Sequence, residues 1–140
     1  MIGIASPNPS GMPGFNTAFG VQAGAGGGAV NARQLPSWYN IVTRVLTAND
    51  SVSLPPAAPG MMVTVANYPD AALGTTNTCV VFGNVNQFGT QDTIAGATGT
   101  QGVTGVAVPA NAVALFWTVT PQRGLTRTPL AGSWQYKILA

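Results

Sequence analysis

The fold class is decided by the run AVALFWTV at residues 112–119, the strongest strand signal in the chain. Its side chains alternate between two sets, Val113, Leu115, Trp117 and Val119 against Ala114, Phe116 and Thr118. Alternation with a period of two, in β-branched and aromatic residues, predicts a β-strand. We expect its tryptophan, Trp117, to lie in the core.

Seven further segments carry the same kind of signal on either side of this run. They are residues 38–46, 51–54, 61–66, 78–82, 91–94, 103–108 and 133–139. Turns rich in Gly, Pro and Asn separate them at short spacing, which is typical of all-β sandwiches and barrels. Residues 36–140 are therefore predicted to form a jelly-roll or Greek-key β-sandwich of about eight strands. Strand counts do not fix topology, so an immunoglobulin-like strand order stays open.

The segment before residue 36 differs sharply in composition. Residues 1–32 contain eight glycines and three prolines but no charged side chain, a composition that does not sustain a helix or a central strand. Four apolar anchors are nevertheless spaced through it, at Met12, Phe15, Phe19 and Val21. We expect residues 1–35 to form an extended arm that orders on a neighbouring subunit or on its own domain. A disordered tail is the alternative.

The arm contains the stretch GAGGGA at residues 24–29, which formally fits a dinucleotide-binding pattern. That motif needs a strand before it, a helix after it and an acidic residue further on. The sequence signals none of these, and Pro36 interrupts the segment where the helix would lie. The stretch is predicted to be a flexible hinge, and no cofactor site is expected.

Titratable side chains are scarce: the chain has no His, no Glu, one Cys and eight charged residues in 140. General acid–base and nucleophilic catalysis at neutral pH rely mostly on such groups placed side by side. Without His and with a single Cys, the chain cannot form a catalytic Ser–His or Cys–His pair, nor a zinc site with Cys and His ligands. The sequence predicts no enzyme, no catalytic residue and no metal site. Cys79 lies in the apolar run TCVVF and is expected to be a buried, inert thiol.

Charged residues make up only 6% of the chain, against roughly 25% in ordinary soluble domains. We expect much of the surface to be covered by other subunits; a neutral β-protein solvated by hydroxyls and amides is the alternative. The net charge of +2 is not clustered, so nucleic-acid binding is not expected. No apolar stretch of membrane-spanning length and no secretion signal occur, which predicts synthesis in a cytoplasm without membrane insertion.

Four segments together resemble a known group of proteins. They are NDSVSLP at residues 49–55, APGMMVTVAN at 58–67, IAG at 94–96 and VAVPANAVALFW at 106–117. Their order is similar to that in small β-domains of tailed-bacteriophage virion proteins, and the whole chain resembles the capsid cement, or decoration, proteins. The resemblance implies a jelly-roll domain, a homodimer and a seat on the outer surface of the capsid. It also implies bridging of neighbouring subunits of the major capsid protein.

The resemblance carries no catalytic residues, and contact residues are predicted from the spacing of apolar side chains. They are Met12, Phe15, Phe19, Val21 and Arg33 in the arm, with Trp38 at the junction. A trimer remains possible beside the favoured homodimer. The alternative function is a receptor- or glycan-binding β-module of a phage tail fibre or tailspike, and a small β-sandwich enzyme is a third hypothesis.

Overall fold

The computed structural model describes residues 16–73, 77–95, 105–118 and 133–139, which form ten β-strands and one short 3-10 helix. The strands are β1 (Thr17–Gln22), β2 (Arg33–Gln34), β3 (Tyr39–Arg44), β4 (Ser51–Ser53), β5 (Met62–Asn67), β6 (Cys79–Phe82), β7 (Thr93–Ile94), β8 (Val106–Val108), β9 (Ala112–Thr118) and β10 (Ser133–Leu139). The 3-10 helix η1 (Ala71–Leu73) follows β5. The predicted all-β class is confirmed. No helix among the described residues has the length and apolar character needed to span a membrane.

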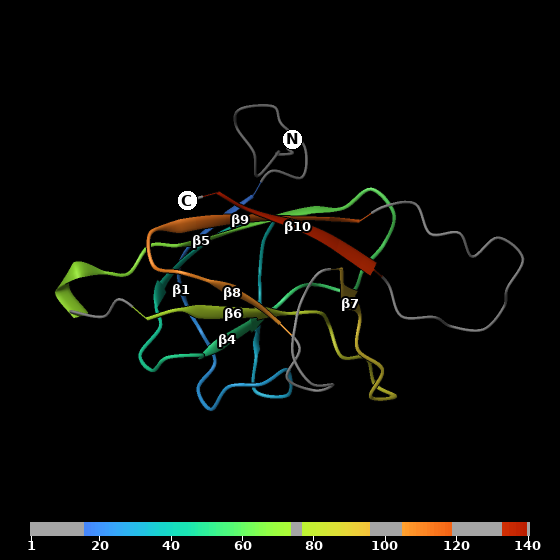
Figure 1. Cartoon of the computed structure of the whole chain (residues 1–140), viewed down its shortest axis with the longest axis horizontal. Coiled ribbons are helices and arrows are strands. Elements are labelled where there is room, and N and C mark those ends of the chain that lie inside the picture. Colours follow the sequence, from blue (N-terminus) through green and yellow to red (C-terminus); the bar gives the residue numbers. More distant parts are fainter. Residues whose placement is uncertain (1–15, 74–76, 96–104, 119–132, 140) are drawn as a thin grey trace, which may run out of the picture.

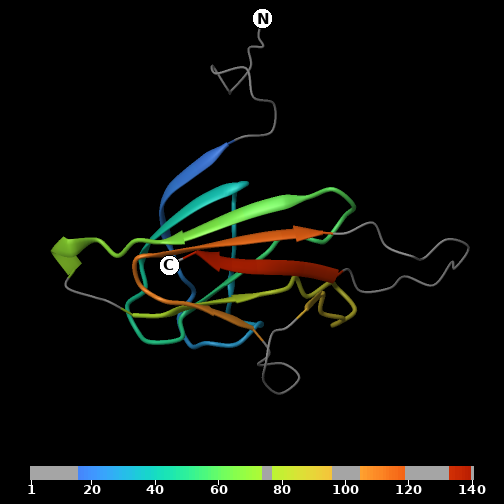
Figure 2. The ribbon, with the colours of Figure 1, turned by 45° about the horizontal axis from the view of Figure 1, so that its top comes forward.

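The strands form two sheets that face each other as a β-sandwich (Figures 1 and 2). The six-stranded sheet has the order β1-β3-β5-β9-β10-β7, and the four-stranded sheet has the order β2-β4-β6-β8. In Figure 1 the layer with β5, β9 and β10 lies above the layer with β4, β6 and β8. The eight predicted strand segments correspond to β3 through β10.

The chain changes sheet at every step from β1 to β9, so neighbours within a sheet are not consecutive in sequence. Strands β1, β3 and β5 pair in parallel, and so do β2, β4 and β6. Strand β9 then pairs antiparallel with both β5 and β10. Jelly rolls are antiparallel architectures, so the jelly-roll order itself does not describe these pairings. The difference arises because strand periodicity identifies a strand and the residues that share one of its faces, but it does not identify the strands with which it pairs.

The expected boundary after residue 35 does not separate an arm from the sandwich in the described residues. Strand β1 is one edge of the larger sheet and β2 is one edge of the smaller sheet. Val21, Ala23 and Leu35 are buried in the core between them. Val21, Ala23 and Leu35 therefore stabilise their own domain. Residues 1–15 lie outside the described residues.

The glycine-rich stretch at residues 24–29 is a hydrogen-bonded turn between β1 and β2 rather than the predicted hinge. Gly26, Gly27 and Gly28 all have positive φ, a conformation that side chains disfavour. The Asn31 side chain donates to the Gly27 carbonyl over 2.9 Å, and the Ser51 hydroxyl donates to the Gly28 carbonyl over 3.0 Å. The Asn31 bond lies within the turn, whereas the Ser51 bond, with the two backbone bonds between Gly24 and Ser51, holds the turn on β4 of the smaller sheet.

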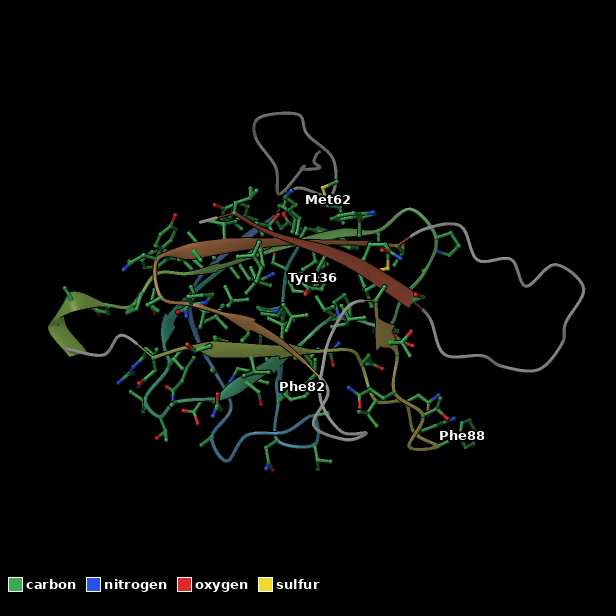
Figure 3. All side chains as sticks on the ribbon, viewed as in Figure 1. Met62, Phe82, Phe88 and Tyr136 are labelled. Carbon is green, nitrogen blue, oxygen red and sulfur yellow. The ribbon has the colours of Figure 1, made fainter. Side chains whose placement is uncertain are left out.

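The core between the sheets contains two large aromatic side chains, Trp134 and Phe116, both fully buried. Valines from both sheets surround them, as expected for β-branched residues on facing pleated surfaces. Tyr136 stacks on Phe116 with ring centroids 6.1 Å apart, and Figure 3 shows it between the two layers. Along β10, Trp134 and Tyr136 alternate with Gln135 and Lys137, and the two aromatic side chains point inward.

Candidate functional site

A continuous row of apolar side chains crosses the side of the six-stranded sheet that faces away from the core. Strand register places Phe19 beside Ile41, Ile41 beside Ala66, Ala66 beside Val113, and Val113 beside Leu139. The row thus spans five strands without a polar side chain. Phe19 and Leu139, at its two ends, are exposed, whereas Ala66 in the middle is flanked by larger side chains and is buried.

Two further rows extend this surface on the same side of the sheet. One consists of Thr17, Tyr39, Thr64, Leu115 and Lys137, and the other of Met62, Trp117 and Gln135. None of these side chains belongs to the hydrophobic core cluster. We call the three rows together the outer face. Its only charged side chain is Lys137, and Figure 3 shows Met62 on this side of the molecule.

The apolar side chains of the outer face depart from the usual pattern of a sheet that has one face exposed to solvent. Such sheets alternate between apolar residues facing the core and polar residues facing water. On β9 this alternation is missing, because Val113, Leu115 and Trp117 point outward and are only half-buried. Met62 on the adjacent strand is 56% exposed. Contiguous apolar patches of this kind mark interaction sites on soluble proteins, so the outer face is the candidate functional site.

The expectation that Trp117 lies in the core is wrong. Phe116 and Ala114 are the inward residues of β9 and are fully buried, while Trp117 lies on the outer face beside Met62 and Gln135. Sequence reasoning also missed Ile41, Met62 and Leu115 as surface residues. The sequence did hold one signal, because residues 112–119 carry apolar side chains on both faces of the strand. In a two-layer sandwich only one of these faces packs against the other sheet, so the second face remains apolar and uncovered.

The predicted contact residues do not gather on one surface in the structure. Phe19 lies on the outer face and is 78% exposed, whereas Val21 is only 7% exposed and belongs to the core. Arg33 is exposed on β2, at an edge of the smaller sheet. Trp38 is half-buried and packs against the core. Met12 and Phe15 lie outside the described residues.

A single glycine explains why Phe19 and Val21, two residues apart, face opposite ways. Gly20 has φ of +79°, and the register with β3 shifts between Phe19 and Val21. A β-bulge at a left-handed glycine adds one residue to a strand and reverses which face the following side chain takes. Val21 therefore pairs beside the buried Val42, and Phe19 beside Ile41.

The predicted burial of Cys79 is confirmed, since its side chain is inaccessible to solvent and forms no disulfide. Burial raises the pKa of the Cys79 thiol to about 12, with a further contribution from the nearby Asp50 carboxylate. Thiolate is the nucleophilic form of cysteine. The native protein therefore holds Cys79 as a neutral thiol throughout the physiological pH range.

We expect two consequences for Cys79 in solution. A thiol reagent at pH 8 should leave the native protein unmodified and modify one thiol per chain in denaturant.

Between pH 9 and about 12 the unfolded thiol ionises while the folded one stays protonated, so the free energy of unfolding should fall as pH rises. The decline attributable to this residue approaches about 1.4 kcal/mol per pH unit. It should be missing in the Cys79→Ala variant, and an equal decline in that variant would contradict this assignment.

The described residues contain no group of three or more His, Cys, Asp or Glu side chains placed to hold a metal ion. No protein-family model, curated protein or solved structure matches this chain.

Proposed function

We propose that this chain is a structural virion protein that decorates and cements the mature capsid shell of a tailed bacteriophage. In this role it sits on the outer surface of the capsid and bridges neighbouring subunits of the major capsid protein. The observation that carries the proposal is the outer face, which has an unbroken apolar row across five strands and a single charged side chain in its three rows. The resemblance of residues 49–119 to phage virion β-domains supports the same conclusion.

The physical demands of cementing match such a surface. A stable protein–protein contact buries about 1,200–2,000 Å² in total, and its centre is depleted of charged residues and enriched in aromatic residues and Met. The outer face offers Phe19, Tyr39, Met62 and Trp117 on a sheet stiffened by the core beneath it. Contact over such a face requires no catalytic or charged groups at the interface. Many copies bound around the same shell multiply a modest affinity of each contact through avidity.

We assign the outer face to contact with the shell and propose a homodimer as the unit that binds. Two copies joined by a two-fold axis present two such faces, which is the simplest arrangement that can hold two capsid subunits at once. Light scattering of the purified chain distinguishes the dimer from a trimer.

Cryo-electron microscopy of the virion whose genome encodes this chain tests the proposal directly. Density for the sandwich should repeat over the outside of the capsid, with the six-stranded sheet turned toward the shell. Density confined to the tail tip or fibres would overturn the cement role and favour the receptor- or glycan-binding alternative.

A further inference from the structure

Strand β1 is an open edge of the six-stranded sheet. It pairs on one side with β3, no described strand pairs with its other side, and Figure 2 shows it, in blue, as the outermost strand of its sheet. The Tyr39 N–H donates to the Asn16 carbonyl over 3.1 Å. Backbone groups of successive residues point to opposite sides of a strand, so the N–H and C=O groups of Thr17 and Phe19 point away from β3. These groups are placed to bond a further strand.

Among the edges formed by the described strands, β1 is the least protected against pairing with another chain. Natural edge strands are kept from pairing by shortness, charge, proline or a bulge. Strands β2 and β7 have two residues each, and β2 contains Arg33; β8 has three residues and is followed by Pro109. Strand β1 has six residues without charge or proline. Its bulge at Gly20 comes only after Phe19, so residues 17–19 form a regular strand that is open to pairing.

The side chains at this edge favour a second copy of the chain as its partner. The apolar row of the outer face ends at β1 with Phe19, whose side chain is 78% exposed. A strand beside β1 that presents an apolar side chain on the same face would cover this ring, and β1 of a second copy presents Phe19 there. Like charges opposite each other destabilise paired strands. Because β1 carries no charge, two copies of it meet without such repulsion.

Antiparallel pairing of two identical edges also fixes the directions in which the two outer faces point. The two-fold axis then runs perpendicular to the sheet, so both outer faces lie on the same side of the dimer. A two-fold axis along the strands would pair them in parallel and turn the outer faces to opposite sides. Since a shell lies on one side of the protein, the antiparallel arrangement is the one in which both copies contact it through their outer faces.

We propose that two copies of the chain join through β1 as an antiparallel pair, with Ala18 on the two-fold axis. Thr17 of each copy then lies opposite Phe19 of the partner subunit, and the two residues exchange both backbone hydrogen bonds. The two Phe19 rings are diagonal neighbours on the outer face, within reach of each other. The inference rests on the proposed function, in which a homodimer binds the shell, and it names the surface that joins the two copies.

The pairing involves few residues, so sedimentation of the purified full-length chain should show a reversible dimer with a Kd of about 1–100 μM. Thr17→Pro removes the N–H that faces the partner and keeps the bonds to β3. It should weaken dimerisation at least about 10-fold, because the two-fold axis repeats the loss, and leave the unfolding midpoint near that of the wild type. The matched control Thr17→Val keeps the N–H and should dimerise as the wild type does.

A disulfide tests the register of the pairing. Residues directly opposite each other in a non-hydrogen-bonded antiparallel pair have Cα atoms about 4.5 Å apart, within the range that a disulfide spans. Mild oxidation of the Ala18→Cys variant should therefore give a covalent dimer. Gln22→Cys, half-buried on the same strand but beyond the bulge, should stay uncrosslinked. The native Cys79 is buried and does not compete.

The outcomes separate the pairing from the function on which it rests, because the dimer is measured without shells. A wild-type chain that stays monomeric, a dimer that Thr17→Pro does not weaken, or an Ala18→Cys variant that does not crosslink would each overturn the pairing through β1. Binding of shells by a chain that is monomeric leaves the cement function standing without this dimer. A dimer that crosslinks through Ala18→Cys but whose wild-type form does not bind shells supports the pairing and overturns the cement function.

Discussion

Replacing Trp134 with alanine is expected to lower the free energy of unfolding by about 3–5 kcal/mol, the range found for aromatic-to-alanine changes in cores. Trp134 is fully buried at the start of β10, where it lies between β9 and β7 in the six-stranded sheet and points into the core. Its removal leaves a cavity that two packed sheets cannot close. Urea denaturation followed by circular dichroism measures the change.

Two control variants test the explanation. Trp117→Ala removes the same side chain from the half-buried outer face and should cost only about 1 kcal/mol. Trp134→Phe should cost far less than Trp134→Ala, because it keeps most of the ring. It also removes an indole N–H that is buried without a hydrogen-bond acceptor among the described residues. Equal losses for Trp117→Ala and Trp134→Ala would contradict the assignment of inner and outer faces.

The double substitution M62K/L139K on the outer face is expected to weaken binding to capsid shells by at least about 100-fold, because each ammonium group would be buried against an apolar partner without a counter-charge. Met62 and Leu139 are 56% and 46% exposed in the free chain. Their long lysine replacements can therefore keep their charges in water, and stability should change by no more than about 0.5 kcal/mol. Sedimentation of shells with added protein measures occupancy.

The matched control for this variant is V30K/A48K, which adds the same charge at exposed loop positions that belong to none of the three rows of the outer face. It should bind shells as the wild type does, which separates the effect of position from that of net charge. If M62K/L139K turns a dimer into a monomer in light scattering while its shell occupancy stays unchanged, the outer face is the dimer interface instead.

Strands β3 to β10 were predictable because each shows the alternation of apolar and polar residues, or the run of apolar residues, within its own segment of sequence. Residues 133–139 show why one face could also be assigned: Gln135 and Lys137 are polar, so Trp134 and Tyr136 must face the core. Residues 112–119 are apolar on both faces, so period alone cannot say which side is inward. Pairing decides it, because the register sets Trp117 beside Gln135 and Phe116 beside Tyr136.

The pairing of strands and the first two strands were beyond sequence reasoning. Strands β1 and β2 flank a glycine-rich turn and are short or bulged, so their local signal is weak. Their stability comes from partners much later in the chain, such as β3 and β4. The outer face follows from the same long-range register, which brings Phe19 and Leu139 into one row across five strands. The spacing of apolar residues in the segment could identify Phe19 but not its neighbours.

Because consecutive strands alternate between the two sheets, the order of the strands affects how the chain folds during its synthesis. Among the described strands, none before β10 pairs with the strand that precedes it, so the ribosome must release two further strands before the first pairing partner, β3, is complete. Chains dominated by such distant pairings fold in milliseconds to seconds rather than microseconds, and their unpaired edges stay open to other chains meanwhile. Slower synthesis at lower temperature should therefore raise the yield of soluble protein, since fewer incomplete chains meet one another.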